Sequence, residues 1–253
     1  MTNRLCRYGW IPDLPDGRDR TFRMPRRASA LPPSVDLRPA CPAVYDQGEL
    51  GSCTANAIGA AVEFDQRKQK LAQPFTPSRL FIYYNERVLA GTVAYDSGAM
   101  LRDGIKAVAS QGTCPEPMWP YVETQFADRP TAPCYATAKS HPAVSYSRLS
   151  QDLGQMKACL AAGYPFVFGF TVYESFESDG VAQSGVMQMP ESSESALGGH
   201  AVLAVGYDDA SKRLLVRNSW GTDWGMAGYF TLPYAYAAGS NFADDFWTIR
   251  LVK

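Results

Sequence analysis

The chain has 253 residues, of which 46% are hydrophobic and 19% are charged. This composition is typical of a globular protein that buries a sizeable core, and it excludes a disordered chain. The 24 basic residues nearly balance the 25 acidic ones, to a formal net charge of −1, so charge indicates neither nucleic acid nor an anionic membrane as a partner.

No stretch reaches the roughly 18 apolar residues that a membrane helix needs. Residues 1–10 have no apolar core of the signal-peptide type. We therefore expect no membrane partner, and the compartment stays open between the cytoplasm and a signal-less export route. The six cysteines are too sparse for a disulfide scaffold and show no zinc-ligand spacing, so we expect no metal and no other cofactor. They are Cys6, Cys41, Cys53, Cys114, Cys134 and Cys159.

In chain order, residues 1–30 are rich in Pro, Arg, Asp and Gly and have no helical or strand period, which predicts an extended arm. Residues 52–111 read as helices. Ser52 is a suitable N-cap for a helix that begins at Cys53. A second helix is predicted from Pro77, and a third contains Leu101 and ends at Gly112.

Residues 113–142 are rich in proline and predict a long irregular crossing. A further helix is predicted over 152–163, and the strands that follow are rich in Val, Phe, Tyr and Thr. These strands are predicted at 165–172, 200–207, 213–218, 228–232 and 246–252, with a hairpin turn at 208–211. Helices first and strands later indicate an α+β protein of two lobes with a cleft between them. We expect an arm over 1–30, a mainly helical lobe over 31–140 and a mainly β lobe over 141–253.

The residues with the clearest chemistry begin at Cys53. It lies at a predicted helix start, after a glycine-containing loop, where the helix dipole and free backbone N–H groups favour a thiolate. The backbone N–H of Cys53 is also suited to bind a developing oxyanion. The side-chain amide of Gln47, a few residues earlier, is a candidate second donor.

His200, one of only two histidines, begins an apolar strand. An imidazolium near Cys53 would lower the pKa of the thiol further. The amide oxygen of Asn218 can accept a hydrogen bond from that ring and fix its orientation, and the indole of Trp220 can keep water from this bond. Taken singly, a histidine at a strand start and an asparagine after a strand are more often structural than catalytic.

At this point the chain resembles the papain/cathepsin family. Four segments are similar to it in the same order: the mature-enzyme start at 31–38, the nucleophile loop at 47–55, the histidine strand at 200–207 and the asparagine segment at 218–229. His200 follows Cys53 by 147 residues and Asn218 follows it by 165. The family spacing is about 130–150, so the asparagine is slightly farther along, as a small insertion would place it.

The resemblance implies a papain-like fold with a helical lobe, an antiparallel β-barrel-like lobe and the active site in the cleft between them. It implies Cys53 as nucleophile, His200 as its partner, Asn218 as the group that orients the imidazole, and Gln47 with the Cys53 amide as oxyanion hole. The paired glycines that bind substrate backbone in the family match Gly98 and Ala99. Leu101 and Gly198 would lie near the adjacent substrate pocket.

Several positions depart from the family. Leu50 replaces the cysteine of the signature around the nucleophile, Thr54 replaces the aromatic residue after Cys53, and Gly199 replaces the usual polar residue before the histidine. A Cys114–Cys134 bridge is left open. Only about thirty residues precede the mature-like start, in place of a long helical prodomain, which is similar to a bacterial, xylellain-like branch of the family. We expect this arm to lie over the cleft and restrain it; the competing reading is a disordered or lobe-packing tail.

The favoured function is hydrolysis of peptide bonds through a thioester, as an endopeptidase under the control of the arm. Protein or peptide substrates are the expected partners, and we expect a monomer. One alternative is acyl transfer to an amine by the same four residues. Another is a peptide-binding relative without catalysis, which the presence of all four catalytic residues disfavours.

Overall fold

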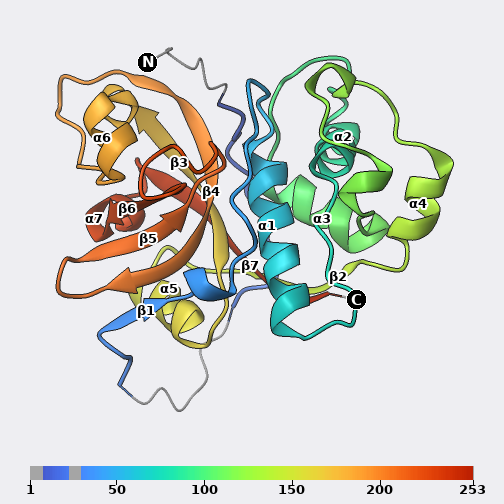
Figure 1. The fold of residues 1–253 in the computed structure, drawn as a ribbon. Helices are drawn as coiled ribbons and strands as arrows, with labels where there is room; N and C mark the ends of the chain where they lie inside the picture. Colours follow the sequence, from blue (N-terminus) through green and yellow to red (C-terminus); the bar gives the residue numbers. More distant parts are fainter. Residues whose placement is uncertain (1–7, 23–29, 253) are drawn as a thin grey trace.

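The structure is a computed structural model that describes residues 8–22 and 30–252 (Figure 1). The arm is therefore described over 8–22, and Cys6 lies outside these ranges. Four helices gather on one side of the molecule, and most of a large antiparallel sheet lies on the other with the remaining α-helices (Figure 1). The four are α1 (Cys53–Lys68), α2 (Arg79–Ala90), α3 (Leu101–Gln111) and α4 (Ala132–Ala138).

The predicted helix ends are largely confirmed. Helix α1 begins at Cys53, and α3 ends before Gly112. Helix α2 begins two residues after the predicted Pro77, because the Ser78 hydroxyl caps it by accepting a hydrogen bond from the Phe81 N–H. The side chain of Ser52 does not cap α1. Its hydroxyl instead lies 2.6 Å from the hydroxyl of Tyr121, which ties the helix start to the proline-rich crossing.

The sheet contains seven strands, in the order β2-β7-β3-β4-β5-β6, with β1 paired to β4. The strands are β1 (Ser34–Asp36), β2 (Ala143–Arg148), β3 (Phe166–Tyr173), β4 (Ala196–Asp208), β5 (Arg213–Arg217), β6 (Tyr229–Pro233) and β7 (Ala243–Val252). The path begins at β2 and ends at β6, and these two strands do not pair with each other. The expected barrel-like lobe is therefore wrong in this respect: the sheet is open, because a barrel requires its first and last strands to pair.

The long strand β4 organises the sheet. It pairs with β3 over Ala196–Ala204 and with β1 over Gly206–Asp208, while β5 pairs along its last residues. The turn predicted at 208–211 joins β4 to β5, and the Asp208 carboxylate accepts from the N–H of Ser211 there. Predicted strands 165–172, 213–218, 228–232 and 246–252 correspond to β3, β5, β6 and β7, each within a few residues.

Some elements were not predicted. Strands β1 and β2 and helices α4, α6 (Asp179–Ser184) and α7 (Tyr234–Ala238) are short. Helix α4 falls in the proline-rich crossing, where Pro133 occupies the first turn, a position that needs no backbone N–H donor. Helix α5 (Leu153–Ala161) was predicted, and Asp152 caps it by accepting from the Gln155 N–H. None of the described helices is both long and apolar enough to cross a membrane.

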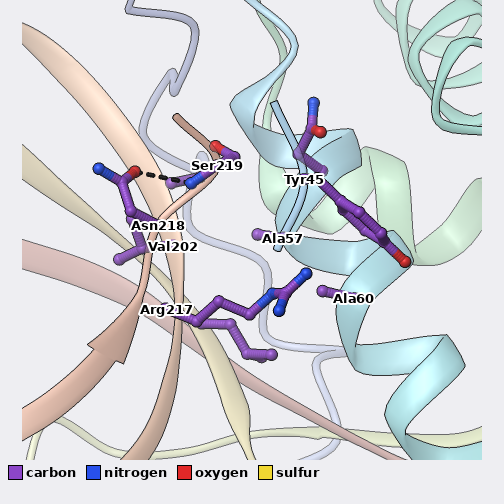
Figure 2. A pocket seen from close by; sticks show the side chains of 10 residues that line it. Tyr45, Ala57, Ala60, Val202, Arg217, Asn218 and Ser219 are labelled. Carbon is purple, nitrogen blue, oxygen red and sulfur yellow. Dashed lines mark hydrogen bonds between the residues drawn. The ribbon is translucent and has the colours of Figure 1, made fainter. Parts of the chain in front are cut away.

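Helix α1 packs against the sheet through small side chains. Figure 2 shows Ala57 and Ala60 of α1 facing Val202 of β4 and Arg217 of β5 across a small pocket. Arg217 is 2% exposed, and its guanidinium donates to the backbone oxygens of Pro42 and Ala43. The arginine therefore holds the segment that leads to Gln47 against the sheet.

The far end of α1 buries a carboxyl group. Asp65 is 1% exposed, and neither of its side-chain oxygens has a hydrogen-bond partner among the described residues. Burial raises the pKa of this carboxyl from 3.8 to about 8, against the opposing influence of Lys68 and Arg250. Between these pH values the unfolded chain ionises while the folded chain keeps its proton, so unfolding releases a proton and the free energy of unfolding falls as pH rises.

We expect Asp65→Asn to remove this loss of stability. The stability difference between the variant and the wild type should grow in favour of the variant from about pH 4 to about pH 8, by at most about 1.4 kcal/mol per pH unit. Urea unfolding at a series of pH values measures it. A difference that stays constant across this window would show that Asp65 ionises normally in the folded protein.

Candidate active site

Cys53 is the first residue of α1 and is fully buried. The backbone N–H groups of Ala201, Gly9 and Thr54 lie within reach of its sulfur. Burial raises the pKa of the thiol to about 12, and these three N–H groups act in the opposite direction. The start of α1 therefore lies directly against strand β4, beside the residue that follows His200.

His200 lies in β4 and is fully buried. Its Nε2 is 2.8 Å from Oδ1 of Asn218, which also accepts from the Ser219 N–H at 2.8 Å. Because an amide oxygen only accepts, Nε2 carries a proton, and Nδ1 of the neutral ring keeps its lone pair. Nδ1 is buried and has no hydrogen-bond partner among the described residues. Burial lowers the pKa of the imidazole to about 4, and the Asn218 bond raises it.

Aromatic rings enclose the imidazole. The Trp220 ring lies 4.9 Å from it between centroids, and Trp220 is 3% exposed, so the indole packs on the imidazole. The ring of Phe170 meets the imidazole edge-on at 5.7 Å. This apolar surrounding strengthens the His200–Asn218 bond by excluding water.

Gln47 is fully buried and tied to the asparagine segment. Its Oε1 accepts from the Ser219 hydroxyl at 2.6 Å, and its backbone N–H donates to the Ser219 oxygen at 2.8 Å. Its Nε2 donates to the backbone oxygen of Leu50 at 2.8 Å. The structure thus brings all four predicted residues together, with Ser219 joining Gln47 to Asn218. Sequence reasoning did not single out Ser219, although it lies next to Asn218.

The arm runs through this site. Gly9 and Ile11 bond to the two backbone groups of Ala99: the Ala99 N–H donates to the Gly9 oxygen at 2.8 Å, and the Ile11 N–H donates to the Ala99 oxygen at 3.0 Å. The Trp10 N–H donates to the Gly199 oxygen at 2.9 Å. Gly98 adjoins them, and a Cβ there would lie 2.2 Å from the Gly9 oxygen. Ala99 of the predicted backbone-binding pair therefore binds the backbone of the arm, and Gly98 packs closely against Gly9.

The two predicted pocket residues, Gly198 and Leu101, lie in different surroundings. Gly198 contacts the arm, because a Cβ at that position would come within 2.8 Å of the Tyr8 side chain. Leu101 is fully buried at the start of α3, in the same hydrophobic cluster as Trp10. The ring of Tyr8 lies edge-on to His200 at 6.4 Å between centroids.

The side chain of Trp10 fills a cavity that has glycine walls. It is 8% exposed, and its Nε1 donates to the Asp245 carboxylate at 3.1 Å. A Cβ on Gly169 would lie 1.9 Å from the indole ring, so only glycine admits the ring there. Neither Asp245 nor Gly169 belongs to a motif, and no local sequence signal identifies them.

Within residues 8–22 and 30–252, no cluster of three or more His, Cys, Asp and Glu side chains is placed to hold a metal ion.

Residues 31–244 match the sequence profile of the papain family cysteine proteases. The chain therefore belongs to this family and is a papain-like cysteine peptidase, as the four motifs predict. It is 41% identical, over 97% of its length and 87% of the relative's, to a peptidase C1-like protein of Acanthamoeba polyphaga mimivirus. It is 34% identical to a cathepsin B-like protein of Giardia intestinalis, over 81% of this chain and 70% of the relative.

A solved structure agrees with this assignment. Xylellain, a cysteine protease from Xylella fastidiosa, superposes with a TM-score of 0.94 at 45% identity and covers 100% of this chain and 99% of its own. The papain-like α+β fold and the similarity to xylellain are thereby confirmed. The structure does not contain the bridge that the sequence leaves open, because Cys114 and Cys134 are both free thiols.

We expect Asn218→Ala to lower kcat/KM for peptide hydrolysis roughly 100-fold, because the imidazole loses the bond that fixes its tautomer and orientation. Steady-state kinetics on a fluorogenic peptide measure this loss. Asn85→Ala is the matched control, since Asn85 is also a buried amide with bonds to Phe81 and Tyr135 but lies on α2 away from the imidazole. Equal losses in the two variants would show that the Asn218 effect is one of stability alone.

Proposed function

We propose that the chain hydrolyses internal peptide bonds through a thioester on Cys53, with its arm restraining the site. The observation that carries the proposal is the contact of the helix-start thiol with β4 beside a buried His200–Asn218 pair. Attack by the thiolate on a peptide carbonyl forms a tetrahedral oxyanion. The Cys53 backbone N–H and the Gln47 side-chain amide are its donors.

His200 moves the proton in both halves of this reaction. The imidazole first removes the proton of Cys53 and then gives it to the leaving amine, which departs and leaves a thioester. A water molecule then gives its proton to the imidazole and attacks the thioester, so the acid is released and the thiol re-forms. The neutral ring supplies Nδ1 as the base, because Nε2 is held by Asn218.

The arm is bound firmly enough to act as a restraint. Ion pairs join Asp19 of the arm to Arg102 at 2.6 Å and Asp13 of the arm to Arg148 at 3.4 Å. The N–H of Asp13 donates to Asp245 at 2.7 Å, and the Asp13 carboxylate accepts from the Arg102 backbone N–H at 3.0 Å. These contacts anchor the chain just after Trp10. Because Gly9 contacts the thiol, the arm and a substrate carbonyl compete for the same space.

The path of the arm also supports action on internal bonds. The chain passes Cys53 at Gly9 and continues along Ala99 to Ile11 and beyond. A cleft that admits a continuous stretch of polypeptide past the nucleophile suits an endopeptidase.

Thiol-directed labelling tests the nucleophile. We expect an epoxide inhibitor of cysteine peptidases to label the wild type once per chain, and Cys53→Ala to lose both the label and peptide turnover, because Cys53 is the thiol at a helix start against the strand that carries His200. Mass spectrometry of the labelled peptides locates the adduct. Cys159→Ala is the matched control, since Cys159 is likewise buried, and it should keep the label. Labelling of Cys53→Ala at the wild-type level would refute the assignment.

Added amine nucleophiles separate hydrolysis from acyl transfer: new amide products would establish the second activity.

The restraint is tested by Trp10→Ala. Removing the indole empties the cavity between Gly169 and Asp245, which costs arm binding about 3 kcal/mol or more. We expect kcat/KM for a small peptide to rise roughly 10- to 100-fold, with the same kcat/KM in an arm-deleted chain. Leu14→Ala is the control on the same arm, because its side chain is 67% exposed, and it should leave turnover unchanged. If Trp10→Ala and arm deletion leave turnover at the wild-type level, the arm only packs on the surface.

A further inference from the structure

A carboxyl group lies enclosed behind the nucleophile. Glu86 of α2 is fully buried, and its Oε1 accepts a hydrogen bond of 2.6 Å from the hydroxyl of Thr54, the residue after Cys53. Its Oε2 has no hydrogen-bond partner among the described residues. A Cβ on Gly104 would lie 2.5 Å from Oε2, so α3 closes over the carboxyl at a glycine. Glu86 thus fills the space where helices α1, α2 and α3 meet.

The charges around Glu86 do not neutralise it. The neighbouring guanidinium of Arg87 donates to the backbone oxygens of Tyr83, Val93 and Tyr95, and the described ion pairs include none with Glu86. From α3 the group that faces it is Asp103, also an acid. From α1 the group that faces it is the Thr54 hydroxyl, and a charge on Glu86 acts through space on the Cys53 thiol of the preceding residue.

Burial raises the pKa of Glu86 to about 8, and Asp103 raises it further, while the Thr54 bond and Arg87 lower it. A negative charge on Glu86 in turn raises the pKa of Cys53. At neutral pH the buried carboxyl therefore keeps its proton and adds no charge behind the nucleophile. When hydroxide removes that proton, the carboxylate opposes the helix dipole that favours the thiolate.

We propose that Glu86 is a positioning residue for the nucleophile: it holds Thr54 and the first turn of α1, and its negative charge, once formed, opposes the Cys53 thiolate. This inference rests on the proposed role of Cys53. It also accounts for the departure at position 54, where a small hydroxyl reaches the carboxyl.

Two uncharged variants separate the two roles. Glu86→Gln keeps an oxygen that accepts from Thr54, whereas Glu86→Met has a similar volume and no such acceptor. We expect both to shift formation of the Cys53 thiolate to lower pH, by up to about one pH unit, which is up to about tenfold more thiolate at a given pH. We expect only Glu86→Met to lower kcat, because only it releases Thr54.

The measurement is a pH titration of thiolate ultraviolet absorbance in the full-length chain. From each titration we subtract the titration of the same variant with Cys53→Ala added. This subtraction removes the absorbance changes of the other thiols and of the tyrosines. Asp65→Asn is the matched control: Asp65 is also a buried carboxyl whose pKa is raised to about 8, but it lies about 18 Å farther along α1. We expect its thiolate midpoint to equal that of the wild type.

Several outcomes overturn the proposal. Coincident midpoints for the wild type and both Glu86 variants would show that no charge from Glu86 reaches the thiol. An equal shift in Asp65→Asn would show a general effect of removing a buried carboxyl. Wild-type labelling and turnover in Cys53→Ala would show that Cys53 is not the nucleophile, which refutes the proposed function as well. Unchanged midpoints in the Glu86 variants would refute only the role of Glu86.

Discussion

The site depends on one packing contact, in which the first residue of α1 lies against strand β4. The Ala201 N–H reaches the Cys53 sulfur, and His200 is the preceding residue of the same strand. Small residues such as Ala57 and Ala60 let the helix approach the sheet, and Arg217 holds the segment before Gln47 in place. The start of α1 with its preceding loop and strand β4 come from distant parts of the chain, so the geometry of the site is a property of this interface.

Local chemistry explains which parts of the structure the sequence predicts. The ends of α1 and α3 follow from a glycine-containing loop and a terminal glycine, whose effects act within a few residues. The catalytic candidates follow from residue type and spacing, because Cys53, His200 and Asn218 keep the order of a known family and His200 keeps its spacing from the cysteine. The loop motif also predicts Gln47 as a candidate oxyanion donor. Its bond to Ser219 was not predicted, because it joins residues 172 positions apart.

The remaining features depend on long-range pairing that no local pattern specifies. An open sheet and a closed barrel have the same alternating strands, and only the partners of β2 and β6 distinguish them. The contacts between Trp10 and Asp245 join residues 235 positions apart. Helix α4 was not predicted because Pro133, a residue type that usually interrupts a helix, here occupies its first turn. The carboxyl of Glu86 gave no signal, since an acid on a predicted helix is normally exposed.

The covalent attachment of the arm has a consequence for how the enzyme would respond to substrate. A tethered segment competes at a fixed effective concentration, of millimolar order for a short flexible connection, that dilution of the protein does not change. The arm bonds to Ala99, Gly199 and Asp245, and in the proposed scheme a substrate competes with the arm for this space. The tethered arm would then raise the apparent KM of every substrate by the same factor, so peptides present well below this raised KM are cut slowly, and abundant or tightly bound chains are cut faster.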